Sequence, residues 1–232
     1  YTSHKGLRMV FTGDYKRRWD PTCPQFEPVE NTHVFISEAT FGLPVFRHPP
    51  TEHEIDRLMR SVADNPDRTH CIGAYSLGKA QRVIKHLRLA GHDRPIYIHG
   101  SLEKLCEVYE AAGVTLGELR PATLEDRSKA AREAFRGEIV IAPPGAFEGK
   151  WAQRFPDPVI GFASGWMSVK QRAKQRGVEL PLVISDHADW DELTDTVREV
   201  DPQELWITYG REDALVRWAE LEGRRAKPLR MV

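Results

Sequence analysis

Cysteine is scarce in this chain. Three cysteines occur among 232 residues, Cys23, Cys71 and Cys106, and none belongs to a Cys-x-x-Cys pair. Their odd number and wide separation argue against a disulfide framework and against a structural zinc knuckle. A reducing compartment fits this cysteine usage, so we expect a cytoplasmic protein.

Long apolar runs and a strong net charge are also missing. No segment approaches the ~18 to 20 apolar residues that cross a bilayer, and the N-terminus lacks the basic and then apolar pattern of a signal peptide. We therefore expect no membrane partner. The formal net charge of −1 excludes a globally basic nucleic-acid binder, so any contact with a polyanion must come from local patches.

Histidines are present but not clustered, and no His-x-His-x-Asp-His run occurs. We interpret eight of them as structural or surface residues, because they lack ligand spacing. These are His4, His33, His48, His53, His70, His86, His92 and His99. The chain also begins without methionine and enters a strand at once, so we expect a portion of the protein to precede it.

The hydrophobic pattern is that of an α/β protein, because apolar runs of strand length alternate with longer amphipathic stretches. The length allows one large domain or two small ones. We predict strands over residues 7–12, 33–37, 70–74, 95–98, 138–142, 158–162, 181–185, 204–208 and 228–231. We predict helices over residues 51–64, 77–90, 101–112, 125–135, 147–154, 166–175, 189–200 and 211–222. Thr51 and Glu54 have the spacing of a capping box, and left-handed glycine caps are expected at Gly91, Gly113, Gly177 and Gly223.

Three predicted strand ends carry acidic or histidine side chains. Asp14 follows Gly13 after the first strand, Glu38 closes the second, and His187 lies just after the strand that ends at residue 185. We expect these side chains to converge on one edge of a sheet and to form a hydrolytic site, built around metal. A carboxylate at Asp14 is suited to bridge two cations ~3.5 to 4 Å apart, although Gly-Asp is also common in ordinary turns.

Each of the other two residues also has two interpretations. Glu38 is suited to accept a histidine ring N–H and thereby to fix its tautomer, or it is a capping or salt-bridged acid. His187 is suited to bind a metal or to protonate a leaving oxygen as a general acid. Asp189 or Ser185 would then cap the helix over 189–200.

A basic run, Lys16, Arg17 and Arg18, follows Asp14 directly. These side chains are placed to steer a phosphate backbone towards the metals. The alternative is a solvated charged face, which is the interpretation that we prefer for the other basic clusters, over residues 170–176 and 224–227.

Several phrases together carry a resemblance to a known family. They lie, in the order of the family, at residues 13–18, 20–23, 38–42, 77–81, 185–190 and 210–215. In these phrases the chain resembles the β-CASP branch of the metallo-β-lactamase fold, above all the bacterial ligase-associated DNA exonucleases, also labelled mRNA 3′-end processing factor-like proteins. The resemblance spans nearly the whole chain.

The fold implied by the resemblance is α/β. It comprises the C-terminal half of a metallo-β-lactamase-type sheet with an inserted, Rossmann-like β-CASP lobe. Residues 1–44 and 166–232 would belong to the metallo-β-lactamase lobe, and residues 45–165 to the β-CASP lobe.

The implied function is that of a phosphodiesterase with two zinc ions, a DNA exonuclease in end processing and repair whose partners are DNA and a DNA ligase. Asp14 matches the bridging metal ligand, whereas Glu38 and His187 match the catalytic pair that assists leaving-group protonation. Tyr209 occupies the position of a metal-binding histidine in the family. Tyrosine is a poor zinc ligand unless deprotonated, and its ordinary pKa is ~10.

Two departures from the family pattern keep alternatives open, namely Tyr209 and the missing histidine run. We expect the full-length parent to be the enzyme and this chain alone to be inactive, because its zinc site is incomplete. The alternatives are a non-catalytic nucleic-acid-binding or scaffolding protein, and a nuclease that processes RNA.

Overall fold

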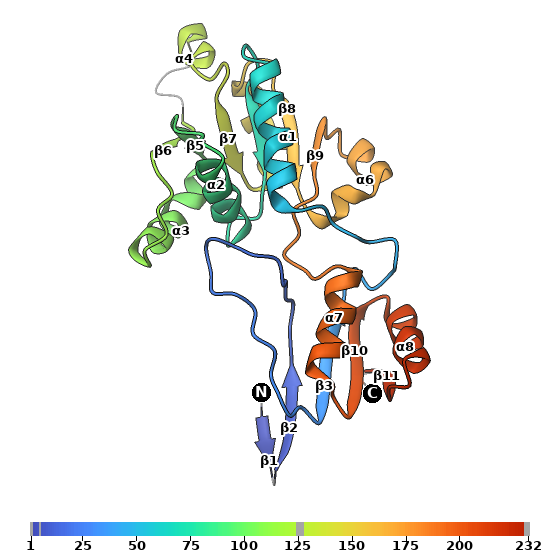
Figure 1. The fold of residues 1–232 in the computed structure, drawn as a ribbon. Helices are drawn as coiled ribbons and strands as arrows, with labels where there is room; N and C mark the ends of the chain where they lie inside the picture. The colour runs from blue at the N-terminus through green and yellow to red at the C-terminus, as the bar shows by residue number, and fades with distance from the viewer. Residues whose placement is uncertain (1, 5, 124–127, 230–232) are drawn as a thin grey trace. The chain divides into compact units, whose positions relative to one another are not determined.

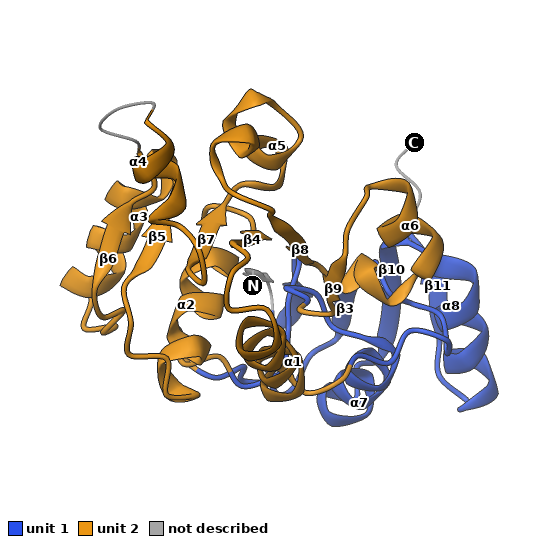
Figure 2. Cartoon of the chain, turned by 90° about the horizontal axis from the view of Figure 1, so that it is seen from above, with its two compact units in different colours: residues 1–19, 25–48, 185–232 blue, residues 20–24, 49–184 orange. Residues whose placement is uncertain are grey.

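The computed structural model describes residues 2–4, 6–123 and 128–229. The chain divides into two compact units, each of which contains its own sheet (Figure 2). Unit 1 comprises Tyr1–Trp19, Gln25–His48 and Ser185–Val232, and unit 2 comprises Asp20–Pro24 and Pro49–Ile184. Both sheets are mainly parallel and both are covered by helices, so the α/β class expected from the sequence is confirmed.

Unit 1 contains a five-stranded sheet in the order β1-β2-β3-β10-β11 (Figure 1). Its strands are β1 (Thr2–His4), β2 (Leu7–Phe11), β3 (Val34–Ala39), β10 (Glu204–Gly210) and β11 (Ala226–Pro228). β1 runs antiparallel to β2, and the remaining pairs are parallel. Two helices, α7 (Trp190–Val200) and α8 (Glu212–Leu221), complete the unit.

The core of unit 1 follows from the pattern of its apolar residues. All six residues of β3 are buried, as expected for a strand covered on both faces. In α7, Leu193, Val197 and Val200 recur at helical spacing and are buried on one face. α7 begins at the N-cap Asp189, which forms a capping box with Glu192. Of the two caps expected from the sequence, Asp189 and Ser185, the structure therefore shows Asp189.

Unit 2 contains a six-stranded parallel sheet in the order β6-β5-β7-β4-β8-β9. Its strands are β4 (His70–Gly73), β5 (Ile96–Ile98), β6 (Leu119–Pro121), β7 (Ile139–Ala142), β8 (Val159–Ala163) and β9 (Leu180–Leu182). Its α-helices are α1 (Thr51–Asp64), α2 (Lys79–Leu89), α3 (Gly100–Ala111), α4 (Lys129–Glu133), α5 (Pro144–Phe147) and α6 (Lys170–Gln175). Two 3-10 helices are η1 (Lys150–Arg154) and η2 (Gly165–Ser168).

The two faces of this sheet are covered by different helices. Ile72 of β4 packs in one core cluster with apolar residues of α1, α2 and α3. The preceding residue, Cys71, points to the other face and packs in a cluster with Phe155 and with residues of α5 and η1. Alternate residues of a strand point to opposite faces, so the chain leaves β4 towards one face and leaves β7 towards the other (Figure 2).

Most of the elements expected from the sequence are present. The predicted strands are all found, with the last one shifted to Ala226–Pro228, and two short strands, β1 and β6, were missed. The helix expected over 147–154 is divided into α5 and η1, and that expected over 166–175 into η2 and α6. Of the helix expected over 125–135, the structure shows α4, whereas residues 124–127 lie outside the described residues, as do 230–231 of the last predicted strand.

One expected cap was wrong, and four were confirmed. Pro50 occupies the N-cap of α1 and no side chain caps the helix. Thr51 instead accepts a hydrogen bond from the buried Arg82, and Glu54 accepts from the backbone N–H of Val183. Both side chains are buried, so tertiary partners replace the local ones. The four glycines expected at helix ends all have left-handed φ values: Gly91, Gly113, Gly177 and Gly223.

The boundaries of the two units differ from the lobe boundaries expected at residues 44/45 and 165/166. After His48 the chain stays in unit 2 up to Ile184, and it returns to unit 1 at Ser185. The return is later because β9 pairs with β8 in the sheet of unit 2, which keeps residues 166–184 in that unit. In the described part of the chain, no helix combines the length and the hydrophobicity needed to span a bilayer.

Candidate active site in unit 1

Two parallel strands place the first two candidate residues at one edge of the sheet. β2 and β3 are in register from Met9 with Val34, and the N–H of Thr12 continues the pairing to the carbonyl of Ile36. Gly13 then turns the chain with φ +59°, a conformation that glycine adopts without steric cost. Asp14 after this turn and Glu38 near the end of β3 therefore share the carboxyl edge.

The third candidate residue reaches this edge through a loop held by backbone contacts. The N–H of Ala188 donates to the carbonyl of Tyr15 at 2.6 Å, which fixes the loop against the turn that carries Asp14. The Ser185 hydroxyl accepts from the N–H of His187 at 3.0 Å. The loop thus presents His187 beside Asp14 and Glu38.

Asp14, Glu38 and His187 come together in the structure. Each offers one ligand atom, and these atoms all lie within 4.8 Å of one another. Across residues 2–4, 6–123 and 128–229, this is the one group of three or more histidine, cysteine or acidic side chains with such geometry. The convergence expected from the three strand ends is therefore present, all within unit 1.

Glu38 is buried and both of its carboxylate oxygens accept hydrogen bonds. Oε1 accepts from the backbone N–H of Tyr15 at 3.0 Å, and Oε2 accepts from that of Thr40 at 3.3 Å. Oε2 also lies 2.9 Å from Nδ1 of His187. Three N–H donors thus occupy most of the acceptor sites of Glu38, an environment that suits an orienting carboxylate better than a metal ligand.

His187 is held in one orientation by Glu38. A carboxylate only accepts, so Nδ1 carries the proton of this hydrogen bond and Nε2 is the nitrogen left for chemistry. The hydrogen bond to Glu38 raises the pKa of His187, partial burial opposes this, and the nearby charges of Glu38, Asp14 and Asp186 raise it further. The imidazolium form of His187 is therefore more stable than that of an ordinary histidine. The Phe41 ring packs edge-on against the His187 ring, with 6.0 Å between the centroids.

Asp14 differs from Glu38 because its side chain is 66% exposed, with an oxygen 3.9 Å from Nδ1 of His187. An exposed carboxylate with free lone pairs is suited to bind a hard or borderline divalent cation. The cluster therefore fits a metal through Asp14. Zinc takes at least three protein ligands, so an ion here would require donors beyond this cluster.

Tyr209, the other expected metal residue, lies at the same carboxyl edge. Its neighbour Thr208 pairs with Glu38, and the register between β10 and β3 shifts between Thr208 and Gly210. Tyr209 is the extra residue of this bulge, with φ +58° and a side chain that is 63% exposed. A positive φ is uncommon for a bulky residue, and residues held in such conformations cluster at active sites. Its role as a metal ligand stays a prediction.

The basic run has acidic partners inside unit 1. Arg17 forms an ion pair with Glu199 at 2.8 Å, and Arg18 forms one with the buried Asp189 at 2.6 Å. Arg18 also lies 3.2 Å from Glu192. These two arginines therefore support the start and the outer face of α7, and this role was not expected. Binding of nucleic acid by Lys16, Arg17 and Arg18 stays a prediction.

The groups that hold Glu38 in place could not be identified from the sequence. Two of its partners are backbone amides, of Tyr15 and Thr40, and amides are present at every residue except proline. Tyr15 itself packs in the hydrophobic core of unit 1, and burial of its phenol raises its pKa to about 12. A tyrosine directly after Gly-Asp was visible in the sequence, but its inward orientation depends on the fold.

The chain is similar to proteins with names from nucleic-acid metabolism, although no family model matches it. A protein of Opitutus terrae named "Probable DNA ligase" is 28% identical over 226 residues, which cover 91% of this chain and 21% of that protein. "Endoribonuclease YSH1" of Saccharomyces cerevisiae is 32% identical over 114 residues, 44% of this chain and 14% of that protein. This chain thus spans about a fifth or less of either relative.

Among solved structures, a protein of unknown function from Enterococcus faecalis V583 has a TM-score of 0.50 at 12% identity, covering 88% of this chain and 51% of that chain. At this identity the likeness concerns the fold alone. A shorter relative, the "Uncharacterized protein in lig 3'region" of Acidianus ambivalens, is 31% identical over 111 residues, 46% of this chain and 73% of that protein. Because this chain matches most of that protein, it belongs to the same family as the Acidianus protein.

Proposed function

We propose that this chain is part of a metal-dependent nuclease that hydrolyses phosphodiester bonds in DNA ends. The proposal includes the finer fold assignment, with a metallo-β-lactamase-type sheet in unit 1 and a β-CASP lobe in unit 2. The observation that carries it is the buried Glu38 hydrogen-bonded to His187 beside the exposed Asp14. This set combines a proton donor of raised pKa with an acid suited to a cation.

His187 acts as the general acid. Cleavage of a phosphodiester leaves an alkoxide oxygen on the sugar, which needs a proton as the bond breaks. Nε2 of His187 supplies that proton, because Nδ1 is engaged by Glu38. Glu38 positions the ring and favours its charged form, so it acts through His187.

Asp14 is the residue that would hold a metal ion, and we propose two zinc ions, completed by ligands outside the cluster. A bound divalent ion supplies Lewis-acid stabilisation of the charge that develops on the phosphoryl oxygens. Exposure of Asp14 leaves its oxygens available for this role. The DNA substrate and a role beside a DNA ligase are proposed from the names of the Opitutus and Acidianus relatives.

Two substitutions test this function in the complete natural polypeptide that contains these residues. His187→Ala should lower kcat on single-stranded DNA by about 10²- to 10⁴-fold with little change in KM, because general-acid catalysis acts in the transition state. Asp14→Asn should lower the zinc retained after dialysis, measured by elemental analysis, a readout that does not depend on turnover.

The matched control is His33→Ala. His33 is a half-buried histidine at the opposite end of β3, where it accepts a hydrogen bond from the backbone N–H of Arg8. Equal losses of kcat in His187→Ala and His33→Ala would contradict the general-acid role. A wild-type polypeptide that binds single-stranded DNA and RNA but cleaves neither in zinc or manganese would favour a scaffolding protein instead.

RNA is the second candidate substrate, favoured by the 32% identity to the protein named Endoribonuclease YSH1. Matched DNA and RNA oligonucleotides, labelled at the 5′ end, separate the two candidates. An exonuclease on DNA releases mononucleotides or shortens the strand progressively. Internal fragments from RNA alone would support an endoribonuclease.

A further inference from the structure

Unit 2 contains a cavity at the point where its sheet reverses direction. From β4 the chain moves outwards to β5 and β6, returns to β7, and then crosses β4 to reach β8. The connections after the neighbours β4 and β7 leave to opposite faces of the sheet. In open parallel sheets, ligands bind near the carboxyl ends of the strands at such a point, and the cavity reaches Gly73 at the carboxyl end of β4.

The cavity has a volume of about 240 Å³ and is lined by the end of β4, by α5 and the residue after it, by β8 and by the turn after α6. Its floor is flat because Gly73 has no side chain, and a Cβ at this position would meet Phe162 and Pro144 at 3.3 Å. The volume is below the roughly 300–1,000 Å³ of sites for drug-sized ligands. It corresponds to about eight waters at ~30 Å³ each, so it suits one small ring system.

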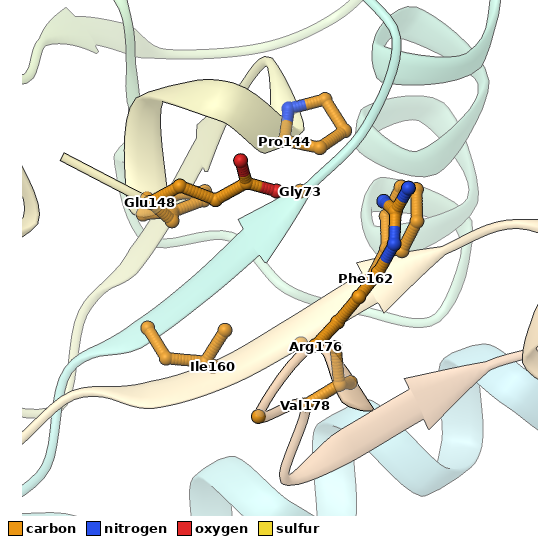
Figure 3. Close-up of a pocket in the computed structure, with 10 residues that line it drawn as sticks. Gly73, Pro144, Glu148, Ile160, Phe162, Arg176 and Val178 are labelled. Carbon is orange, nitrogen blue, oxygen red and sulfur yellow. The ribbon is translucent and has the colours of Figure 1, made fainter. Parts of the chain in front are cut away.

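Two opposite charges flank this cavity. Figure 3 shows the Glu148 carboxylate directed towards Gly73, and the Arg176 guanidinium lying along the Phe162 ring on the opposite side. The guanidinium carbon is 5.2 Å from the centre of that ring. Both charged side chains are exposed, and within the described part of the chain Glu148 has no ion-pair or hydrogen-bond partner. A carboxylate free to accept and a stacked cation therefore face the same small space.

We propose that this cavity binds a guanine base. Guanine is flat and presents two adjacent N–H donors on one edge and two acceptors, O6 and N7, on another. The donor edge matches the carboxylate of Glu148, and the acceptor edge matches the guanidinium of Arg176. Adenine, cytosine and uracil each lack one of these paired edges. This inference concerns unit 2 alone, and it does not depend on the hydrolytic role of unit 1.

The same guanine chemistry has two sources, a free nucleotide or a base within a single strand. The surface beside the cavity favours the strand. Tyr75 is 56% exposed just after β4, and its ring packs edge-on against Phe162 at 6.4 Å. Exposed aromatic rings next to a base site provide a platform for the neighbouring base.

Nucleotide titrations followed by methyl NMR test the proposal on the 232-residue chain. GMP should shift the methyl signals of Ile160 and Val178, which line the cavity. IMP, which lacks the exocyclic amino group, should bind about tenfold more weakly, as expected for one charge-assisted hydrogen bond, and AMP, CMP and UMP should bind more weakly still. Glu148→Gln should weaken GMP binding at least tenfold and abolish the preference over IMP.

Glu107→Gln is the matched control, because Glu107 is also exposed in unit 2 but does not line the cavity. Val178→Phe, which fills the space, is a second variant that should abolish binding. An octamer of thymidines with one central dG identifies the source: tighter binding than GMP indicates a strand, and weaker binding a free nucleotide. Equal shifts from GMP, AMP, CMP and UMP, no shift at millimolar GMP, or equal effects of Glu148→Gln and Glu107→Gln would overturn the proposal.

Discussion

At the scale of single residues, Glu38 is the side chain on which the candidate site depends. It is 1% exposed, and burial of a carboxylate is costly unless hydrogen bonds compensate. Two amides and the imidazole of His187 provide that compensation. Glu38 therefore links the folding of this edge to the protonation of His187.

Replacement of this acid by its neutral isostere tests the link. Glu38→Gln should lower the pKa of His187 towards that of an ordinary histidine, because the hydrogen bond and the charge of Glu38 are the main causes of its increase. The imidazole proton signals of His187, followed by NMR in metal-free buffer between pH 5 and 9, measure the change. Glu27→Gln removes an exposed acid of unit 1 and is the control; an unchanged His187 titration in Glu38→Gln would contradict the link.

At the scale of elements, the bulge in β10 brings two backbones together. Gly210 has φ +87°, and a Cβ there would overlap with the carbonyl oxygen of Ala39 and approach Cα of Thr40 at 2.8 Å. That carbonyl also accepts hydrogen bonds from the N–H groups of Gly42 and Arg211. The carbonyl is thus held in place, and glycine is the one residue type that fits beside it.

A pair of glycine substitutions separates two costs of adding a Cβ, namely the strain of a left-handed backbone and the steric overlap with neighbouring atoms. Gly223→Ala should lower the free energy of unfolding by about 1–2 kcal/mol, the cost of a left-handed alanine, because no atom lies within 4 Å of its Cβ. Gly210→Ala should cost ~3 kcal/mol or more, since the backbone of β3 must also move. Urea unfolding of both variants gives the comparison, and equal losses would show that the bulge yields easily.

At the scale of the whole molecule, the histidines of the two units respond to acid with opposite sign. In unit 2, burial lowers the pKa of His70, His86 and His92, and nearby arginines lower each further. In unit 1, Glu38 raises the pKa of His187. The unfolded chain titrates all four near the ordinary value of ~6.5.

Acidification should therefore weaken unit 2. Below pH ~6.5 the unfolded chain binds protons that the three folded histidines resist, so their contribution falls as the pH drops towards the folded values. The His187 contribution has the opposite sign: it is fully present below ~6.5 and is lost as the pH rises through its raised folded pKa. Hydrogen exchange by mass spectrometry at pH 7.5 and 5.5, corrected for intrinsic rates, should show protection lost in β4 and α2 more than in β3. Uniform loss would contradict this account.

The sequence by itself determined the alternation of strands and helices, the glycine caps and the strand ends that carry Asp14, Glu38 and His187. These features depend on local patterns, because periodicity and turn residues act over a few positions.

The tertiary structure alone decided which groups are the hydrogen-bond and ion-pair partners of these and other polar side chains. It assigned backbone amides to Glu38, acidic partners to Arg17 and Arg18, and partners distant in the chain to Thr51 and Glu54. It also placed Glu148 opposite Arg176, 28 positions later in the chain, around one cavity. Such pairings join segments that are distant in the chain. No local sequence pattern encodes the distance between two side chains that come together only when the strands of a sheet assemble.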